Sequence, residues 1–106
     1  ESGWWTAPER IGDRIAPLVG AAAGQIVVGD STSVNVFKAV VAAARIAGEG
    51  RDEILVDATT FPTDGYIAAS AARLTGHRLV PVAPADVPAA LGPRTAAVLL
   101  NHVDYR

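Results

Sequence analysis

Short aliphatic runs alternate along the chain with longer stretches in which apolar residues recur at helical spacing. The runs 25–28, 53–57, 78–82 and 95–100 are typical of buried strands. Helical periodicity predicts helices from 34 to the glycines at 48–50, over 64–75 with Gly76 at its end, and over 85–91. Pro81 favours an edge position or a strand end for the run 78–82.

Another helix is predicted near the beginning of the chain. Thr6 is placed to cap it, and Glu9 stands three residues later, which is the pattern of a capping box. Apolar residues then follow helical spacing over 11–19. Pro17 should kink or shorten this helix, and the glycines in 20–24 should end it.

The predicted order is one helix, then three strand–helix pairs, then a last strand. This alternation predicts an α/β fold with a mostly parallel sheet covered by helices on both faces. The chain stops directly after the last strand, with no helix to cover it. We therefore expect residues 1–106 to form part of a domain that is truncated at its C-terminus.

Composition excludes several classes of function. The net charge is −2 and no basic run is present, so a charged surface for nucleic acid is not supported. The absence of cysteine excludes disulfides and thiolate metal sites. Apolar runs end well short of the ~20 residues of a membrane span, and no secretory signal opens the chain. We expect a cytoplasmic protein with neither nucleic acid nor membrane as partner.

Two loops offer candidate chemistry, because each lies where a predicted strand ends and a helix begins. Ligands of open α/β sheets bind at that edge. In the first loop, 29–35, the hydroxyls of Ser31, Thr32 and Ser33 stand at a helix start, which attracts phosphate. The alternative is that they are ordinary helix caps.

The second loop, 60–64, adds an aromatic ring and a carboxylate at the same edge. Phe61 could stack on a heteroaromatic ring, and Asp64 could favour a protonated ring nitrogen. Alternatively, Asp64 only stabilises the dipole of the helix that it opens. Together the two loops indicate half of a site for a flat, phosphorylated, nitrogen-containing cofactor.

The remaining polar and aromatic residues form no catalytic constellation. Lys38 is the only lysine, and a solvated helix residue is favoured over an imine-forming one. His102 follows a strand and could join the site, whereas His77 lies in a predicted loop. Trp4 and Trp5 are expected to pack against a partner segment. We predict no metal ligands and assign no catalytic residue within the chain.

At this point the sequence resembles the kynureninase family. The resemblance rests on Asp-Ser-Thr-Ser-Val-Asn-Val-Phe-Lys at 30–38, Phe-Pro-Thr-Asp-Gly-Tyr at 61–66 and His-Val-Asp-Tyr-Arg at 102–106. The segments 11–16 and 18–21 are also similar to that family. Its members are pyridoxal phosphate (PLP) enzymes of the aspartate-aminotransferase fold type.

The resemblance implies that Thr32 and Ser33 bind the PLP phosphate, that Phe61 stacks on the pyridine ring and that Asp64 lies near its nitrogen. It implies a homodimer that hydrolyses L-kynurenine or 3-hydroxykynurenine to anthranilate or 3-hydroxyanthranilate and L-alanine, in tryptophan catabolism. The family's Asp-x-x-His stretch and Schiff-base lysine do not occur here, and Lys38 matches a helix lysine of the family. We therefore expect the first part of the cofactor domain, inactive without the remainder of the enzyme.

Three alternatives stay open at this stage. The chain could belong to another PLP enzyme of the same fold type, such as a desulfurase-like or aminotransferase-like protein. It could be a non-catalytic domain that binds a phosphate or a partner. It could also be a complete small α/β ligand-binding protein, although an uncovered parallel sheet argues against this.

Overall fold

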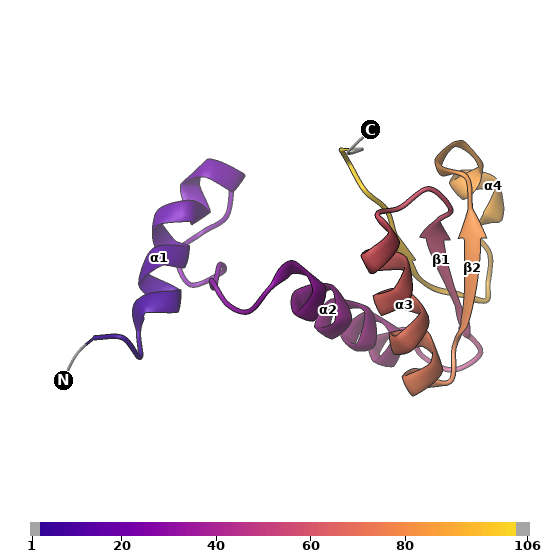
Figure 1. The fold of residues 1–106 in the computed structure, drawn as a ribbon, viewed down its shortest axis with the longest axis horizontal. Helices are drawn as coiled ribbons and strands as arrows, with labels where there is room; N and C mark the ends of the chain where they lie inside the picture. Colours follow the sequence, from indigo (N-terminus) through magenta and orange to yellow (C-terminus); the bar gives the residue numbers. More distant parts are fainter. Residues whose placement is uncertain (1–2, 104–106) are drawn as a thin grey trace. The chain divides into compact units, whose positions relative to one another are not determined.

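The computed structural model describes residues 3–103, so 1–2 and 104–106 lie outside the description given below. The chain divides into two compact units, Glu1–Ser31 and Thr32–Arg106, and each is described by itself. Figure 1 shows both as ribbons. Within the described residues, no helix has the length and apolar character needed to cross a membrane.

The first unit contains one α-helix, α1 (Ala7–Ile15), continued by a 3₁₀ helix, η1 (Ala16–Val19). The expected effect of Pro17 is confirmed, because the α-helix ends two residues before it and Gly20 closes the turn with a φ of 73°. The prediction of a capping box is wrong. Thr6 is the N-cap residue but makes no side-chain cap hydrogen bond, and its hydroxyl donates instead to the Gly3 carbonyl oxygen, 3.4 Å away.

The predicted strand 25–28 is also wrong, because this segment is irregular and returns alongside α1. Asp13 Oδ1 accepts a hydrogen bond from the Gly24 amide at 2.7 Å, and the Val28 amide donates to the Pro8 carbonyl oxygen at 3.3 Å. A strand requires a neighbouring strand to pair its backbone groups. In the described residues this segment bonds to the helix, so its β-branched side chains do not make it a strand.

The second unit is a three-stranded parallel sheet with helices. Its elements are α2 (Thr32–Ile46), β1 (Glu53–Asp57), α3 (Pro62–Thr75), β2 (Arg78–Val82), η2 (Pro84–Asp86), α4 (Val87–Ala90) and β3 (Thr95–Leu99). The strand order is β2-β1-β3, and both pairings are parallel. The expected α/β class is confirmed, and Pro81 lies, as predicted, on an edge strand of this sheet.

The core lies between the sheet and the two long helices. Ile54 of β1 is fully buried together with Val40 and Ala44 of α2 and Ala71 and Ala72 of α3. The small alanine side chains allow the two helices to lie close together over the strands. Leu55 is buried too, although it points to the other face of the pleated strand, so β1 is covered on both faces.

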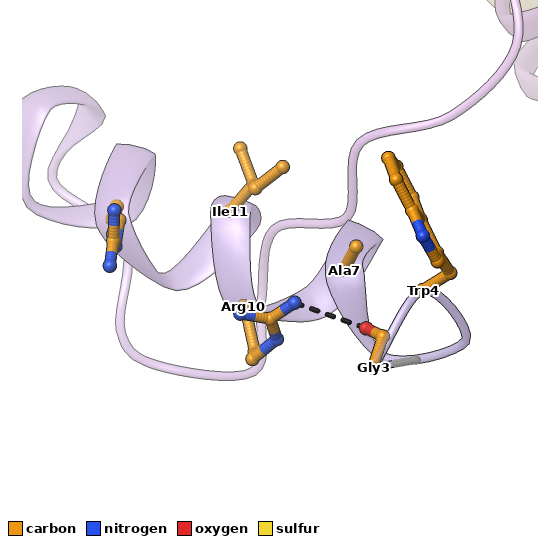
Figure 2. A pocket seen from close by; sticks show the side chains of 6 residues that line it. Gly3, Trp4, Ala7, Arg10 and Ile11 are labelled. Atoms are coloured by element: carbon orange, nitrogen blue, oxygen red, sulfur yellow. Dashed lines mark hydrogen bonds between the residues drawn. The ribbon is translucent and has the colours of Figure 1, made fainter. Parts of the chain in front are cut away.

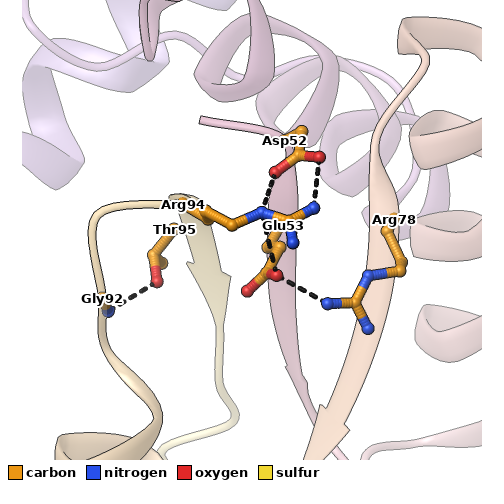
Figure 3. A network of polar contacts seen from close by, with 6 residues as sticks. All are labelled: Asp52, Glu53, Arg78, Gly92, Arg94 and Thr95. Atoms are coloured by element: carbon orange, nitrogen blue, oxygen red, sulfur yellow. Dashed lines mark hydrogen bonds and ion pairs between the residues drawn. The ribbon is translucent and has the colours of Figure 1, made fainter. Parts of the chain in front are cut away.

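Charged residues tie the amino ends of the three strands together (Figure 3). Arg94 binds Asp52 with two hydrogen bonds, Nε–Oδ1 at 2.8 Å and Nη2–Oδ2 at 2.6 Å. Glu53, which follows Asp52, pairs with Arg78 of β2. The hydrogen bond from Arg94 holds the pKa of the Asp52 carboxyl below its usual range. This network stabilises the edge of the sheet opposite to the one that carries the candidate site.

Candidate functional site

The two candidate loops both open helices at the carboxyl edge of the sheet. α2 leads into the amino end of β1, and α3 leads into the amino end of β2. Both helices therefore run against the strands, and their first turns lie at the carboxyl edge. Thr32 and Ser33 lie in the first turn of α2, and Phe61 and Asp64 lie at the start of α3; their part in a cofactor site stays a prediction.

Thr32 is the first residue of α2 and is exposed, and Ser33 follows it and is half-buried. The first turn of this helix contains no acidic residue, and a helix start carries a partial positive charge. Just before the helix, Asp30 has a φ of 52°, the left-handed conformation that aspartate tolerates better than most residues. Hydroxyls and amides at such a start suit a phosphate group.

Phe61 and Asp64 belong to the beginning of α3. Phe61 is the N-cap residue, with an extended backbone (φ −53°, ψ 131°), as expected for a residue that precedes proline. Phe61 is 46% exposed, and an aromatic ring can stack on a flat heteroaromatic ligand. Asp64 lies in the first helical turn and is half-buried, so its carboxylate also stabilises the helix dipole.

Sequence reasoning missed three polar residues at this edge, Asp57, Thr59 and Asn101. Asp57, the last residue of β1, is buried and accepts hydrogen bonds of 2.7 Å from both the amide and the hydroxyl of Thr59. Asn101, just beyond β3, donates from Nδ2 to the hydroxyl oxygen of Thr60 at 2.9 Å. The available signal was position alone, since Asp57 ends one apolar strand and Asn101 lies two residues beyond the end of another, at the edge where ligands bind.

A hollow of about 420 Å³ lies beside the start of α3. It is lined by residues from the ends of β1 and β2 and from the first turns of α3, among them Asp57, Thr60 and Tyr66. Neither Phe61 nor Asp64 lines it. We therefore do not assign this hollow to the cofactor.

Other residues considered from the sequence lie in varied places. His102 is exposed just beyond β3, at the carboxyl edge, whereas His77 lies in the turn before β2, at the opposite edge, with Nδ1 3.0 Å from the Thr75 carbonyl oxygen. Lys38 is an exposed residue of α2. No cluster of three or more histidine, cysteine or acidic side chains that could hold a metal ion occurs between residues 3 and 103. The motif residues 104–106 lie outside the described part.

In the first unit, Trp4 borders a separate hollow of about 370 Å³ on one side of α1 (Figure 2). Arg10 Nη2 donates to the Gly3 carbonyl oxygen at 3.0 Å, and Ala7, Ile11 and Arg14 also line the hollow. The exposed fraction is 79% for Trp4 and 93% for Trp5. That these rings pack against a partner segment remains a prediction.

Comparison with known proteins finds curated relatives that match nearly the whole of this chain. No protein-family model matches the chain. The chain is 48% identical to the kynureninase of Deinococcus radiodurans over 104 residues, which are 97% of this chain and 25% of that protein. It is 41% identical to the kynureninase of Burkholderia pseudomallei strain 1106a and 40% identical to that of Pseudomonas fluorescens, in each case over 99% of this chain and 27% of the relative.

The resemblance to kynureninase is thus confirmed over nearly the whole of this sequence. The chain spans about a quarter of the length of the curated relatives that it matches.

Proposed function

We propose that the chain is the N-terminal part of the cofactor domain of a kynureninase, a PLP-dependent hydrolase that cleaves L-kynurenine or 3-hydroxykynurenine. The observation that carries this proposal is the sequence identity of 40–48% to kynureninases over almost the entire chain. It is supported by the location of the two matching loops, which open neighbouring helices at one edge of a parallel sheet.

The residues at this edge fit PLP in kind. The hydroxyls of Thr32 and Ser33, at the start of α2, would hold the phosphate, and the half-exposed ring of Phe61 would lie against the pyridine. The carboxylate of Asp64 would favour a protonated pyridine nitrogen. When bound, PLP draws electrons from the α carbon of the substrate. The chain's own residues would bind and orient it.

The catalytic lysine would come from elsewhere in the complete enzyme. Lys38 is the only lysine of the chain, and it lies on α2 rather than in a loop at the carboxyl edge. We therefore expect the 106-residue polypeptide alone to cleave no kynurenine. Turnover of kynurenine by the pure polypeptide would contradict this expectation. A homodimer, proposed from the same resemblance, can be checked by measuring the molar mass of the full chain in solution.

The decisive experiment uses the full-length protein that carries this sequence. We expect it to bind PLP, with a new absorbance band, and to release fluorescent anthranilate from L-kynurenine. Offering cysteine, or an amino acid with a keto acid, tests the desulfurase-like and aminotransferase-like alternatives. PLP binding without cleavage of either kynurenine would overturn the substrate assignment, and no PLP binding would overturn the whole proposal.

The phosphate site has its own test. Ser33→Ala should weaken PLP binding by ~10-fold or more, because hydrogen bonds to charged groups contribute about 1.5–3 kcal/mol. Ser70→Ala is the matched control, since Ser70 lies in the middle of α3, away from the carboxyl edge. PLP dissociation constants from fluorescence titration provide the comparison. Equal affinities of the two variants would show that Ser33 is only a helix residue.

A further inference from the structure

We propose that Asn101 is a positioning residue of this site: through its hydrogen bond to Thr60, it fixes the β1–α3 loop and hence the direction of the Phe61 ring. The inference rests on the proposed function, because it concerns the ring face offered to PLP. It goes beyond that function by assigning a role to a residue that the sequence motifs do not contain.

The contact joins two segments that are distant in sequence. Asn101 Nδ2 donates to Thr60 Oγ1 at 2.9 Å, across the carboxyl ends of the neighbouring strands β3 and β1. The Thr60 methyl group faces the helix instead, since a Cβ placed on Gly65 would lie 3.5 Å from Thr60 Cγ2. Thr60 is therefore held by Asn101 through its hydroxyl, while its methyl group lies on the side of α3.

The backbone of the β1–α3 loop is also hydrogen-bonded to the ends of β1 and β2. The Ala58 amide donates to the Val82 carbonyl oxygen of β2 at 2.9 Å, and the Thr60 amide donates to the Asp57 carbonyl oxygen at 3.0 Å. Asn101 adds a link to the end of β3. The loop is thus attached to the ends of all three strands just before the residue that carries the ring.

Phe61 follows Thr60 directly and precedes Pro62, whose ring restricts the Phe61 backbone. The direction in which the Phe61 side chain leaves the backbone therefore depends on the torsions at residue 60. The hydrogen bond from Asn101 to the Thr60 side chain reduces the conformational freedom of residue 60. Because the amide of Asn101 does not titrate, the link holds at every pH at which the fold is stable.

The test compares Asn101→Ala, Thr60→Val and the double variant in the full-length protein. Thr60→Val keeps the shape of the side chain and removes only the hydroxyl. Each single variant should weaken PLP binding by ~3–10-fold, the equivalent of one ordinary hydrogen bond. The double variant should bind PLP no more weakly than the weaker-binding of the two single variants, because the two substitutions remove the same hydrogen bond. Amide hydrogen exchange of residues 58–65, without PLP, should rise in all three variants.

Thr75→Val is the matched control. The Thr75 hydroxyl also donates a hydrogen bond, to the Ala71 carbonyl oxygen at 2.9 Å, but at the far end of α3. This variant should lower the melting temperature comparably while leaving PLP affinity unchanged. Faster exchange in residues 58–65 with unchanged PLP affinity would overturn the positioning role, as would additive effects in the double variant. If the parent protein binds PLP but cleaves no kynurenine, the substrate assignment fails while the positioning role survives; a parent that binds no PLP overturns both.

Discussion

At the scale of single residues, Gly12 shows how one missing side chain sets the path of a segment. It is the buried residue of α1, and a Cβ placed on it would lie 2.0 Å from the Ile26 carbonyl oxygen. No real contact is that short, and the atom it would meet is backbone, so the segment 25–28 would have to move. The absence of a side chain at this position therefore allows the irregular return segment to lie against the helix.

We predict that Gly12→Ala destabilises the full-length protein, despite the better helix propensity of alanine. The gain of ~1 kcal/mol from propensity should be outweighed by overpacking, which typically costs about 1–3 kcal/mol. Urea unfolding of the two proteins measures the difference, and hydrogen exchange should localise it to residues 7–28.

Gly65→Ala is the matched control, because Gly65 is also a helical glycine. Its added Cβ would meet Thr60 Cγ2 at 3.5 Å, an ordinary van der Waals contact. This variant should keep or raise the stability of the protein. If Gly12→Ala proves as stable as Gly65→Ala, the close approach to Ile26 does not constrain the segment.

At the scale of elements, the ion-pair network at the amino edge makes the stability of the sheet depend on pH. The pKa of Asp52 is lowered, first by the hydrogen bond from Arg94, so the carboxylate is favoured in the folded state. A group with a depressed folded pKa contributes stability above its unfolded pKa, about 3.9, and loses it as the pH falls through the folded value. The contribution is therefore present at pH 7 and lost in acid.

We predict that Asp52→Asn is less stable than the parent at pH 7 and that this difference shrinks as the pH falls below about 4. Denaturant unfolding at a series of pH values from 7 to 2.5 measures it. Glu49→Gln is the control, since Glu49 is exposed and forms no ion pair among residues 3–103. A pH-independent difference for Asp52→Asn would mean that the ion pair does not contribute to folding.

The sequence predicted the elements of the second unit well because several signals agree there. The runs 53–57 and 78–82 match β1 and β2 residue for residue, and 95–100 matches β3 to within one residue. Each follows a helix that ends in glycine or a turn, so pattern and stop signals coincide. The run 25–28 also follows glycines that end a helix, yet it forms no strand. β-branched residues favour the extended conformation, but a strand also needs a neighbouring strand to pair its backbone hydrogen bonds.

Part of the candidate site could likewise be predicted from the sequence, and part could not. Phe61 and Asp64 could be placed at the carboxyl edge from the sequence because they follow the strand at 53–57, whereas the strand expected before Thr32 and Ser33 is not formed. The link between Asn101 and Thr60 could not. It joins residues 41 positions apart, and its existence depends on β3 pairing with β1. Long-range side-chain contacts of this kind follow from the topology rather than from local pattern.

At the scale of the whole molecule, the boundary between the two compact units falls directly before the predicted phosphate site. The first unit ends at Ser31, and the second begins with Thr32, the first residue of α2. A phosphate bound there would contact the amides and hydroxyls of the first turn of α2. Ligand binding should therefore stabilise the start of this helix.

We predict that PLP slows amide hydrogen exchange in residues 29–35 of the full-length protein, by up to ~100-fold at a concentration 100 times the dissociation constant. Inorganic phosphate alone should protect the same residues more weakly, since it supplies the phosphate contacts without the ring, and it should leave residues 58–65 unchanged. Residues 84–90, which contain η2 and α4, provide the internal control for nonspecific protection. Protection that appears equally in 29–35 and 84–90, or only in 58–65, would mean that the phosphate does not bind at the start of α2. Protection confined to 29–35 and 58–65 would place both halves of the cofactor where the two loops meet the carboxyl edge of the sheet.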